Sequence, residues 1–240
     1  MRKSILVMSG KGGVGKTTIA VNLSYLLYGQ GFQVGLLDVD IHGPNALKML
    51  GHDNISLKIK NGKLQPFVLH SNLKIASLAG YIDDDSAVIW RGPRKHGAIK
   101  QLSQDVEWGE LDYLIVDFPP GTGDEHISAA QLLPDIYGAV IISTPQKVSL
   151  MDMNRSIDFC NQINIPILGA IENMSGGIFG SDTVKNNCDK KGINFIGKIN
   201  LSETIINSSE NGRSFVEQKD IELNNNFKQI VENMIGGDKK

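Results

Sequence analysis

The sequence has little cysteine, almost no net charge and no long apolar run. Its 240 residues include two cysteines, Cys160 and Cys188, which argues against a disulfide-stapled scaffold. The formal net charge of -2 gives no overall attraction to nucleic acid or to an acidic membrane. The apolar run at 5–8 is shorter than a signal-peptide core, and nothing approaches the ~20 apolar residues of a membrane span. These features predict a cytoplasmic protein with no nucleic-acid partner and no stable membrane association.

What the sequence does contain is an alternation of short apolar runs with amphipathic segments. Hydrophobic residues make up 41% and charged residues 21%, an ordinary globular mixture. The alternation predicts an α/β fold, a doubly wound and mostly parallel sheet flanked by helices, in a single domain over residues 1–240. We expect strands at 5–8, 33–38, 113–117, 138–143, 167–171 and 194–196, and helices at 16–29, 93–105, 125–132, 149–163, 182–191 and 223–234.

Two further segments carry local signals. Asn61-Gly62 lies between the strand-like runs 56–60 and 63–68, and this dipeptide favours a tight hairpin turn. The predicted helix at 223–234 places Phe227, Ile230 and Val231 on one face, as either a membrane-targeting helix or a helix packed on the domain requires. Its other face mixes Lys228 with Glu232 and has no basic stripe, which favours packing on the domain.

The most informative segment follows the first predicted strand and opens the first predicted helix. It fits the pattern G-x-x-x-x-G-K-[ST], in which glycines let backbone N–H groups curl around phosphate oxygens. The lysine of this pattern reaches the β- and γ-phosphates, and the hydroxyl after it binds Mg²⁺. The sequence therefore predicts an ATP and Mg²⁺ site at Gly10, Lys11, Gly12, Gly13, Val14, Gly15, Lys16, Thr17 and Thr18.

Lys11 adds a second lysine at the start of this loop, the variant known as the deviant Walker A. A lysine at that point is badly placed to contact the nucleotide of its own subunit. It could instead reach across an interface to the nucleotide of another subunit, or be a solvated surface lysine.

Two other predicted strands end in carboxylates. Asp38 and Asp40 lie at the end of one apolar run, and Asp117 at the end of another. Ligands gather at the carboxyl ends of parallel strands, and phosphoryl transfer to water needs a cation and a positioned water. Asp38 and Asp117 are candidates to hold Mg²⁺ through its waters, and Asp40 to orient the attacking water. The alternative for each is a cap at the end of its strand.

After Asp117 the chain continues with Phe118-Pro119-Pro120-Gly121-Thr122-Gly123. The two prolines stiffen this turn, and Gly121 could bring its N–H close to a γ-phosphate. A loop of this kind would relax when the γ-phosphate leaves, which is the behaviour of a nucleotide sensor.

Together these segments resemble the Mrp/ApbC family of iron–sulfur cluster carrier ATPases, within the MinD-related deviant Walker A group. Besides the loop, the resemblance rests on two branch-specific signatures, W-R-G-P and D-x-P-P-G-T-G-D, and it covers nearly the whole chain. The segments that carry it are 10–18, 38–45, 88–93, 108–113, 117–125, 143–146 and 172–175.

The resemblance implies a slow ATPase that works as a homodimer, or as a heterodimer with a paralogue, with ATP between the subunits. In that arrangement Lys11 acts on the partner's nucleotide and Asp40 positions the attacking water. Asn173 matches the asparagine that bonds adenine in the wider group. Apo iron–sulfur proteins are the implied acceptors.

The sequence departs from the family after Ser175. Cluster carriers usually have C-x-x-C there, and two subunits donate four thiolates to a bridging [4Fe–4S] cluster. This chain has Gly176-Gly177-Ile178-Phe179-Gly180 instead. Cys188 is a weak candidate for an iron–sulfur ligand, and both cysteines fit half-buried helix positions better.

Smaller clusters leave alternatives open. His42 could touch nucleotide or partner, or face solvent in its loop. The basic residues Arg91, Arg94, Lys95 and Lys100 could meet an acidic partner or form an ordinary helix face. The alternative function is a MinD/ParA-like regulatory ATPase that carries no cluster. A small-molecule ligase of similar fold has less support, because the two signatures belong to the other branch.

Overall fold

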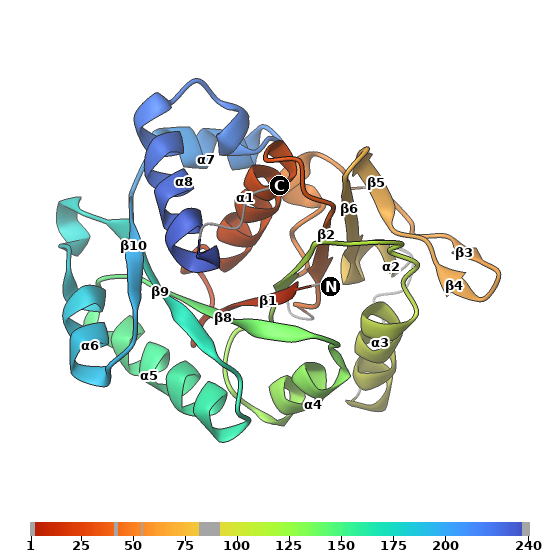
Figure 1. Cartoon of the computed structure of the whole chain (residues 1–240), viewed down its shortest axis with the longest axis horizontal. Coiled ribbons are helices and arrows are strands. Elements are labelled where there is room, and N and C mark those ends of the chain that lie inside the picture. The colour runs from red at the N-terminus through yellow and green to blue at the C-terminus, as the bar shows by residue number, and fades with distance from the viewer. Residues whose placement is uncertain (1–2, 41–42, 54, 82–91, 237–240) are drawn as a thin grey trace.

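An eight-stranded sheet with helices on both faces forms the body of the protein (Figure 1). The computed structural model describes residues 3–40, 43–53, 55–81 and 92–236. The strand order is β10-β9-β8-β1-β7-β2-β6-β5, and every neighbouring pair is parallel except β5 and β6. The predicted doubly wound, mostly parallel fold is therefore confirmed. The strands are β1 (Lys3–Met8), β2 (Val34–Asp38), β5 (Phe67–His70), β6 (Leu73–Ser77), β7 (Tyr113–Asp117), β8 (Ile136–Ser143), β9 (Ile167–Ser175) and β10 (Phe195–Asn200).

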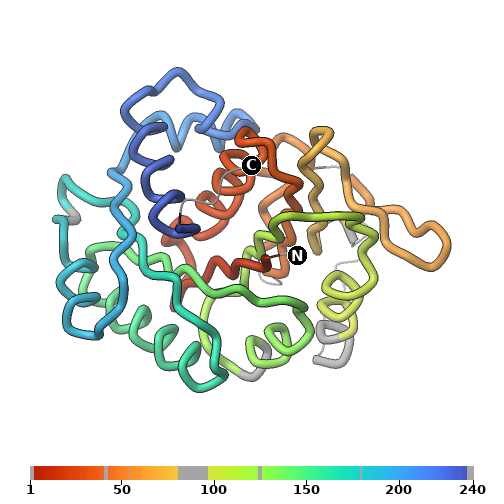
Figure 2. The backbone as a smooth tube through the Cα atoms, in the orientation of Figure 1, coloured from red at the N-terminus to blue at the C-terminus, as the bar shows by residue number. Residues whose placement is uncertain are grey.

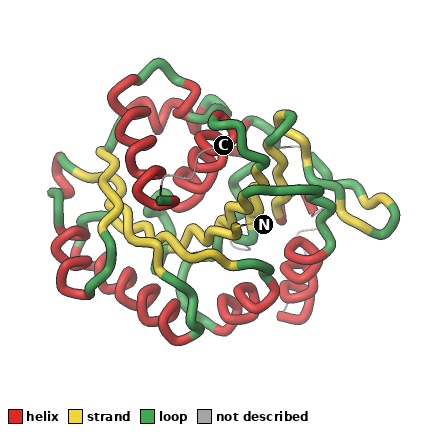
Figure 3. The backbone as a smooth tube through the Cα atoms, in the orientation of Figure 1, coloured by secondary structure: helices red, strands yellow, loops and turns green. Residues whose placement is uncertain are grey.

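The helices divide into two layers, which Figure 3 shows in red on either side of the yellow sheet. Helices α1, α7 and α8 cover one face, and α3, α4, α5 and α6 cover the other. Two large clusters of buried side chains match these faces, because successive strand residues point to opposite sides of a sheet. The helices are α1 (Lys16–Gly29), α2 (Leu78–Tyr81), α3 (Gly92–Gln104), α4 (Asp124–Leu132), α5 (Lys147–Gln162), α6 (Thr183–Lys191), α7 (Glu203–Glu210) and α8 (Ile221–Ile235), with 3₁₀ turns η1 (Lys48–Leu50), η2 (Gly177–Phe179) and η3 (Phe215–Glu217).

The predicted helices match α1, α3, α4, α5, α6 and α8 to within two residues at each end. Strands β9 and β10 each run four residues further than the apolar pattern indicates. The extension of β9 contains Glu172 and Asn173, which are polar but only 0% and 6% exposed. Both side chains form hydrogen bonds, so a polar sequence continues a buried strand.

The Asn61-Gly62 hairpin is confirmed as β3 (Ile59–Lys60) and β4 (Lys63–Leu64), and it projects from the body of the fold (Figure 2). Asn61 and Gly62 have φ of 53° and 76°, as the tight hairpin turn requires. The predicted strand at 63–68 is broken, and its second part begins β5, which pairs antiparallel with β6 at the edge of the main sheet. Strands β5 and β6 were not distinguished in the sequence, nor were α2 and α7.

The C-terminal helix α8 packs on the domain, as predicted. Phe227, Ile230 and Val231 are at most 2% exposed. Gly197 of β10 makes the close approach possible, since a Cβ there would lie 2.6 Å from Cγ1 of Ile230. The apolar face is thus occupied by the sheet, which removes the basis for a membrane-targeting role.

Asn22 ties α1 to the segment that precedes α8. Its Oδ1 accepts hydrogen bonds from Ser214 Oγ at 2.6 Å and from the N–H of Phe215 at 2.8 Å. Its Nδ2 donates to the carbonyl of Thr18 at 2.8 Å. The side chain is 2% exposed, so water cannot replace these bonds.

We predict that Asn22→Ala lowers the free energy of unfolding by about 2–4 kcal/mol, because it leaves buried donors and an acceptor unpaired. Urea denaturation measures the change. Asn226→Ala is the matched control, since Asn226 is exposed and makes one bond, to the carbonyl of Lys198 at 2.8 Å. Equal losses in the two variants would contradict the structural role of Asn22.

Candidate nucleotide site

The loop between β1 and α1 has the backbone of a phosphate cradle. Gly13 and Gly15 have φ of 78° and 84°, a region that side chains disfavour. A Cβ on Gly15 would lie 2.2 Å from Nδ2 of Asn173, so glycine is also required there by space. Helix α1 begins at Lys16 without a side-chain cap, and its first-turn N–H groups face the loop. This geometry suits an anion at the helix N-terminus.

The register of the sheet brings the predicted acids to this loop. Asp117 of β7 pairs with Val7 of β1 on one side and with Asp38 of β2 on the other. The carboxyl ends of these three central strands therefore lie beside the start of α1. The sequence showed each strand end separately, and the structure brings them together.

Lys16 and Thr17 both contact Asp117. The Lys16 ammonium lies 2.5 Å from Asp117 Oδ1 and 3.5 Å from Asp40 Oδ2. Thr17 Oγ1 donates to Asp117 Oδ2 at 2.6 Å. Burial alone would lower the pKa of Lys16, but the charge of Asp117 and its hydrogen bond, with the charges of Asp40 and Asp38, raise the pKa overall. Lys16 is therefore held as a cation.

Asp38 organises the segment that follows β2. Its Oδ1 accepts from the N–H of Asp40 at 3.1 Å, and its Oδ2 accepts from the N–H of Ala46 at 3.1 Å and from Ser77 Oγ at 3.0 Å. These bonds are those of a cap at the end of a strand, which was the alternative to Mg²⁺ binding for this residue. A role in holding Mg²⁺ through water stays a prediction. Ile41 and His42, which continue this segment, lie outside the described residues.

The site carries excess negative charge. Burial, and then the charge of Asp117, raise the pKa of Asp38 to about 7. Burial also raises the pKa of Asp117, although the Lys16 charge and the bonds from Lys16 and Thr17 oppose the change. Three carboxylates face one ammonium here, so a divalent cation next to Thr17 would relieve their repulsion. The donor set, a hydroxyl with carboxylates, fits Mg²⁺.

Lys11 lies near the start of the phosphate loop, and Asn173 of β9 contacts the loop near its end. Lys11 Nζ donates to Gln146 Oε1 at 3.3 Å on the surface. Asn173 Nδ2 donates to the carbonyl of Val14 at 2.8 Å. The second N–H and the Oδ1 of this amide are additional bonding groups at the same position, as contact with a base requires.

A cavity of about 270 Å³ adjoins Asn173 and the loop residues Gly15 and Thr18. Its lining is mostly apolar, as a flat aromatic ring requires. Most of this cavity was not predicted from the sequence, because helix α7 was not. The signal for that helix was Ser202, which caps it by accepting from the N–H of Thr204 at 3.2 Å. The apolar residues of its lining are Met49, Met174, Leu201, Ile205 and Ile206.

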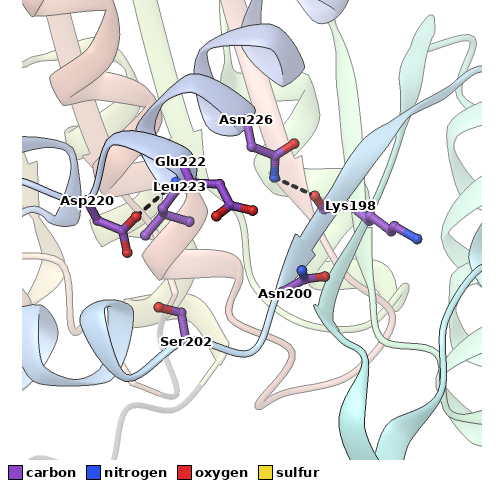
Figure 4. A pocket seen from close by; sticks show the side chains of 7 residues that line it. All are labelled: Lys198, Asn200, Ser202, Asp220, Glu222, Leu223 and Asn226. Atoms are coloured by element: carbon purple, nitrogen blue, oxygen red, sulfur yellow. Dashed lines mark hydrogen bonds between the residues drawn. The ribbon is translucent and has the colours of Figure 1, made fainter.

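A polar hollow of about 350 Å³ lies beside this cavity, between β10, α7 and α8 (Figure 4). Asn200 and Ser202 line both spaces. In the hollow, Asp220 Oδ1 accepts from the N–H of Leu223 at 3.0 Å, which caps α8. The loop residues 10–18 contribute nothing to the described lining, so the hollow is not part of the phosphate site.

The N–H of Gly121 donates to the carbonyl of Ser9 at 3.0 Å. Its predicted bond to a γ-phosphate stays a prediction. The φ of Gly121 is 106°, so a side chain would be strained there. Gly121 thus ties the loop at 118–123 (the second-switch loop) to Ser9, which precedes the phosphate loop. A bond to a nucleotide would require this one to be exchanged.

His126 closes the same loop from the other side, a role that the sequence pattern does not predict. Its Nδ1 lies 3.0 Å from the N of Gly123, and its Nε2 lies 3.0 Å from the carbonyl oxygen of Pro120. The ring packs beside Phe118 and Phe159. Its partners are backbone atoms, which leave no residue pattern to detect.

The chain offers no exposed thiol for a cluster. Cys160 and Cys188 are both 0% exposed, so they are more deeply buried than the half-buried positions predicted. Burial raises the pKa of Cys160 to about 12 and that of Cys188 to about 11. Cys188 lies in an apolar cluster with Ile141 and Val184. Within the described ranges, no group of three or more His, Cys, Asp or Glu side chains is arranged to hold a metal ion.

The W-R-G-P signature at 90–93 falls mostly outside the described residues, which include only Gly92 and Pro93 of it, in α3. Lys100 of the basic cluster is exposed on that helix. In the part of the chain that the structure covers, none of the helices has the length and apolar character needed to cross a bilayer.

Comparison with known proteins extends the resemblance to the whole chain. A family model for ParA, described as "NUBPL iron-transfer P-loop NTPase", matches residues 1–235. An iron-sulfur cluster carrier protein of Methanocaldococcus jannaschii is 43% identical over 98% of this chain and 84% of its own length. The protein of the same name from Methanococcus maripaludis is 39% identical over 100% of this chain and 86% of its own.

Solved structures show the same fold. A nucleotide-binding protein from Archaeoglobus fulgidus in complex with ADP aligns with a TM-score of 0.77 and 31% identity, over 90% of this chain and 89% of its own. The septum site-determining protein MinD from Pyrococcus horikoshii, complexed with Mg-ADP, aligns with a TM-score of 0.73 over 97% and 95% of the two chains; at 23% identity it shows the fold alone. By its sequence matches, the chain belongs to the ParA/NUBPL family of iron-transfer P-loop NTPases.

Proposed function

We propose that the protein binds and hydrolyses ATP as a nucleotide-bridged dimer and serves in the assembly of iron–sulfur proteins. The observation that supports hydrolysis is the meeting of Lys16, Thr17 and Asp117 at the ends of the central strands, with Asp40 3.5 Å from Lys16 Nζ. This arrangement supplies phosphate binding, a cation site and a carboxylate beside the γ-phosphate position.

In the proposed reaction, the N–H groups of 10–18 bind the phosphates and Lys16 binds their β- and γ-oxygens. Thr17, with Asp38 and Asp117 acting through water, would hold Mg²⁺, which would supply positive charge beside the phosphate oxygens. Asp40 accepts a hydrogen bond from the attacking water. Asn173 and the apolar cavity beside it bind the adenine.

The surface around Lys11 supports a second copy of the chain as its partner. Val148 and Met151, near the start of α5, are 63% and 62% exposed, and Ile178 in η2 is 94% exposed. Thr183 Oγ1 donates to the carbonyl of Pro145 at 2.8 Å, which ties the segment after η2 to the start of α5. Covering these apolar side chains would stabilise a dimer. The partner would be a second copy of this chain or a paralogue.

The iron–sulfur role rests on the relatives, which carry that name, and on the family model. Neither cysteine of this chain is accessible, so cluster ligands would come from elsewhere, such as a paralogue in a heterodimer. An alternative with specific support is a MinD/ParA-like regulator without a cluster, because the described surface presents no thiol. Activation of an apo iron–sulfur acceptor separates the two functions. If this protein with ATP increases the activation, it serves in assembly. If the activation does not change, the regulator is favoured.

Asp40→Asn and Lys16→Ala should differ in what they lose. We predict that Asp40→Asn lowers kcat by about 10²-fold while ATP affinity stays within a few-fold, because only water positioning is removed. Lys16→Ala should weaken ATP binding as well. Phosphate release and a fluorescent ATP analogue measure the two quantities, with exposed Asp105→Asn as the control. A full rate in Asp40→Asn would refute its role.

Lys11→Ala should lower turnover by at least about 10²-fold, as removal of a cationic finger does. Exposed Lys100→Ala is the control and should retain the rate.

Mixing tests whether Lys11 acts in trans. A mixed dimer of Lys11→Ala and Asp40→Asn has one complete site only if Lys11 serves its partner's nucleotide. An equal mixture should then recover about a quarter of the wild-type rate, because half of the dimers of a two-fold assembly are mixed. No recovery would show that Lys11 acts within its own subunit.

Cys188→Ala should leave the iron and acid-labile sulfide of anaerobically reconstituted protein unchanged, because the thiol is buried and protonated. Cys160→Ala is the matched control. About four irons per dimer in the wild type, lost in Cys188→Ala, would show instead that α6 opens and that Cys188 binds a cluster.

A further inference from the structure

His126 bonds to two backbone groups of the loop that follows β7. A backbone N–H can only donate, so the N–H of Gly123 fixes Nδ1 as an acceptor without a proton. The proton of the neutral ring is then on Nε2, which donates to the carbonyl of Pro120 at 3.0 Å. The imidazole therefore joins both ends of the Pro120–Gly123 turn as the Nε2–H tautomer.

This contact has the form of a capping box. Gly123 is the N-cap of α4 and His126 is the third residue of that helix. The N–H of His126 donates to the carbonyl of Gly123 at 2.9 Å, and the side chain returns a bond to the N–H of Gly123. Glutamine or glutamate usually takes this position. Histidine adds a second bonding atom, which reaches the carbonyl of Pro120.

The turn is connected directly to the phosphate loop. The N–H of Phe118 donates to the carbonyl of Val7 at 3.1 Å, and the N–H of Gly121 donates to that of Ser9 at 3.0 Å. Ser9 Oγ in turn donates to the carbonyl of Lys11 at 2.9 Å, inside the phosphate loop. His126 is thus connected to Lys11 through its bonds to Pro120 and Gly123, the backbone of the turn between them, and the bonds from Gly121 to Ser9 and from Ser9 to Lys11.

We propose that His126 is a positioning residue for ATP hydrolysis, which holds the second-switch turn against the end of β1. This inference rests on the proposed ATPase function. His126 touches no reacting atom. It fixes the backbone of Gly121 and through Ser9 that of the phosphate loop, so that the site is assembled before ATP binds. Because its ring is 7% exposed, water cannot take over the two bonds.

Three variants separate the bonds from the packing of the ring. His126→Phe keeps an aromatic ring beside Phe118 and Phe159 and removes both bonds. His126→Asn keeps an acceptor near the position of Nδ1 and loses the donor to Pro120. His126→Gln restores an acceptor for Gly123 and a donor for Pro120, and it is the rescue variant. Thermal denaturation first confirms that each variant is folded.

Two measurements read the effect. Hydrogen–deuterium exchange of a peptide that covers 118–126 reports opening of the turn, and steady-state kinetics gives kcat and KM for ATP. In His126→Phe we expect exchange about tenfold faster and kcat about tenfold lower, with KM within about twofold. His126→Asn should be intermediate, and His126→Gln should return both quantities to within about threefold of the wild type.

Faster exchange in His126→Phe with an unchanged kcat would overturn the proposal, because the bonds would then be structural only. Equal behaviour of His126→Phe and His126→Gln would overturn it too, since packing alone would explain the residue. If the wild type shows no turnover, the proposed ATPase function has failed. Hydrogen–deuterium exchange and ATP affinity then test whether His126 holds the turn. A His126→Phe variant that matches the wild type in both would show that it does not.

Discussion

The nucleotide site depends on one constraint, the register of three central parallel strands. Val7, Asp117 and Asp38 lie side by side across β1, β7 and β2. A shift of one residue would turn Asp117 to the other face of the sheet and separate it from Lys16 and Thr17. The apolar residues that precede these positions fix the register, because they are buried on both faces. Packing of the core thus sets the geometry of the charged groups.

That geometry places charge where a protein ordinarily avoids it. Lys16 and Asp117 are 6% and 0% exposed and contact each other at 2.5 Å, with Asp38 fully buried beside them. Burying these groups costs stability unless each has partners. Backbone N–H groups, Ser77 and Thr17 supply those partners. The arrangement is consistent with a site built to bind a charged ligand.

Much of this could be predicted from the sequence because its signals are local. The phosphate loop, the acids at strand ends and the helices each occupy one short segment with its own pattern. The cavity beside Asn173 could not be predicted, because it forms where Met49, Asn173 and Ile205 meet from distant segments. The bond from the Gly121 N–H to Ser9 could not be predicted for a similar reason, because Ser9 lies over a hundred residues earlier in the chain. His126 was missed because it acts on backbone atoms.

The buried cysteines give the protein a use beyond its own chemistry. The folded chain presents no thiol to an alkylating reagent, since both of its cysteines are 0% exposed. Cys160 is a buried residue of α5 with its Sγ 3.8 Å from Sδ of Met8, and Cys188 is a buried residue of α6. Labelling can occur only when these layers open, so its rate measures the local opening equilibrium. The two residues are therefore natural reporters of local opening at α5 and α6, which can be compared with and without nucleotide.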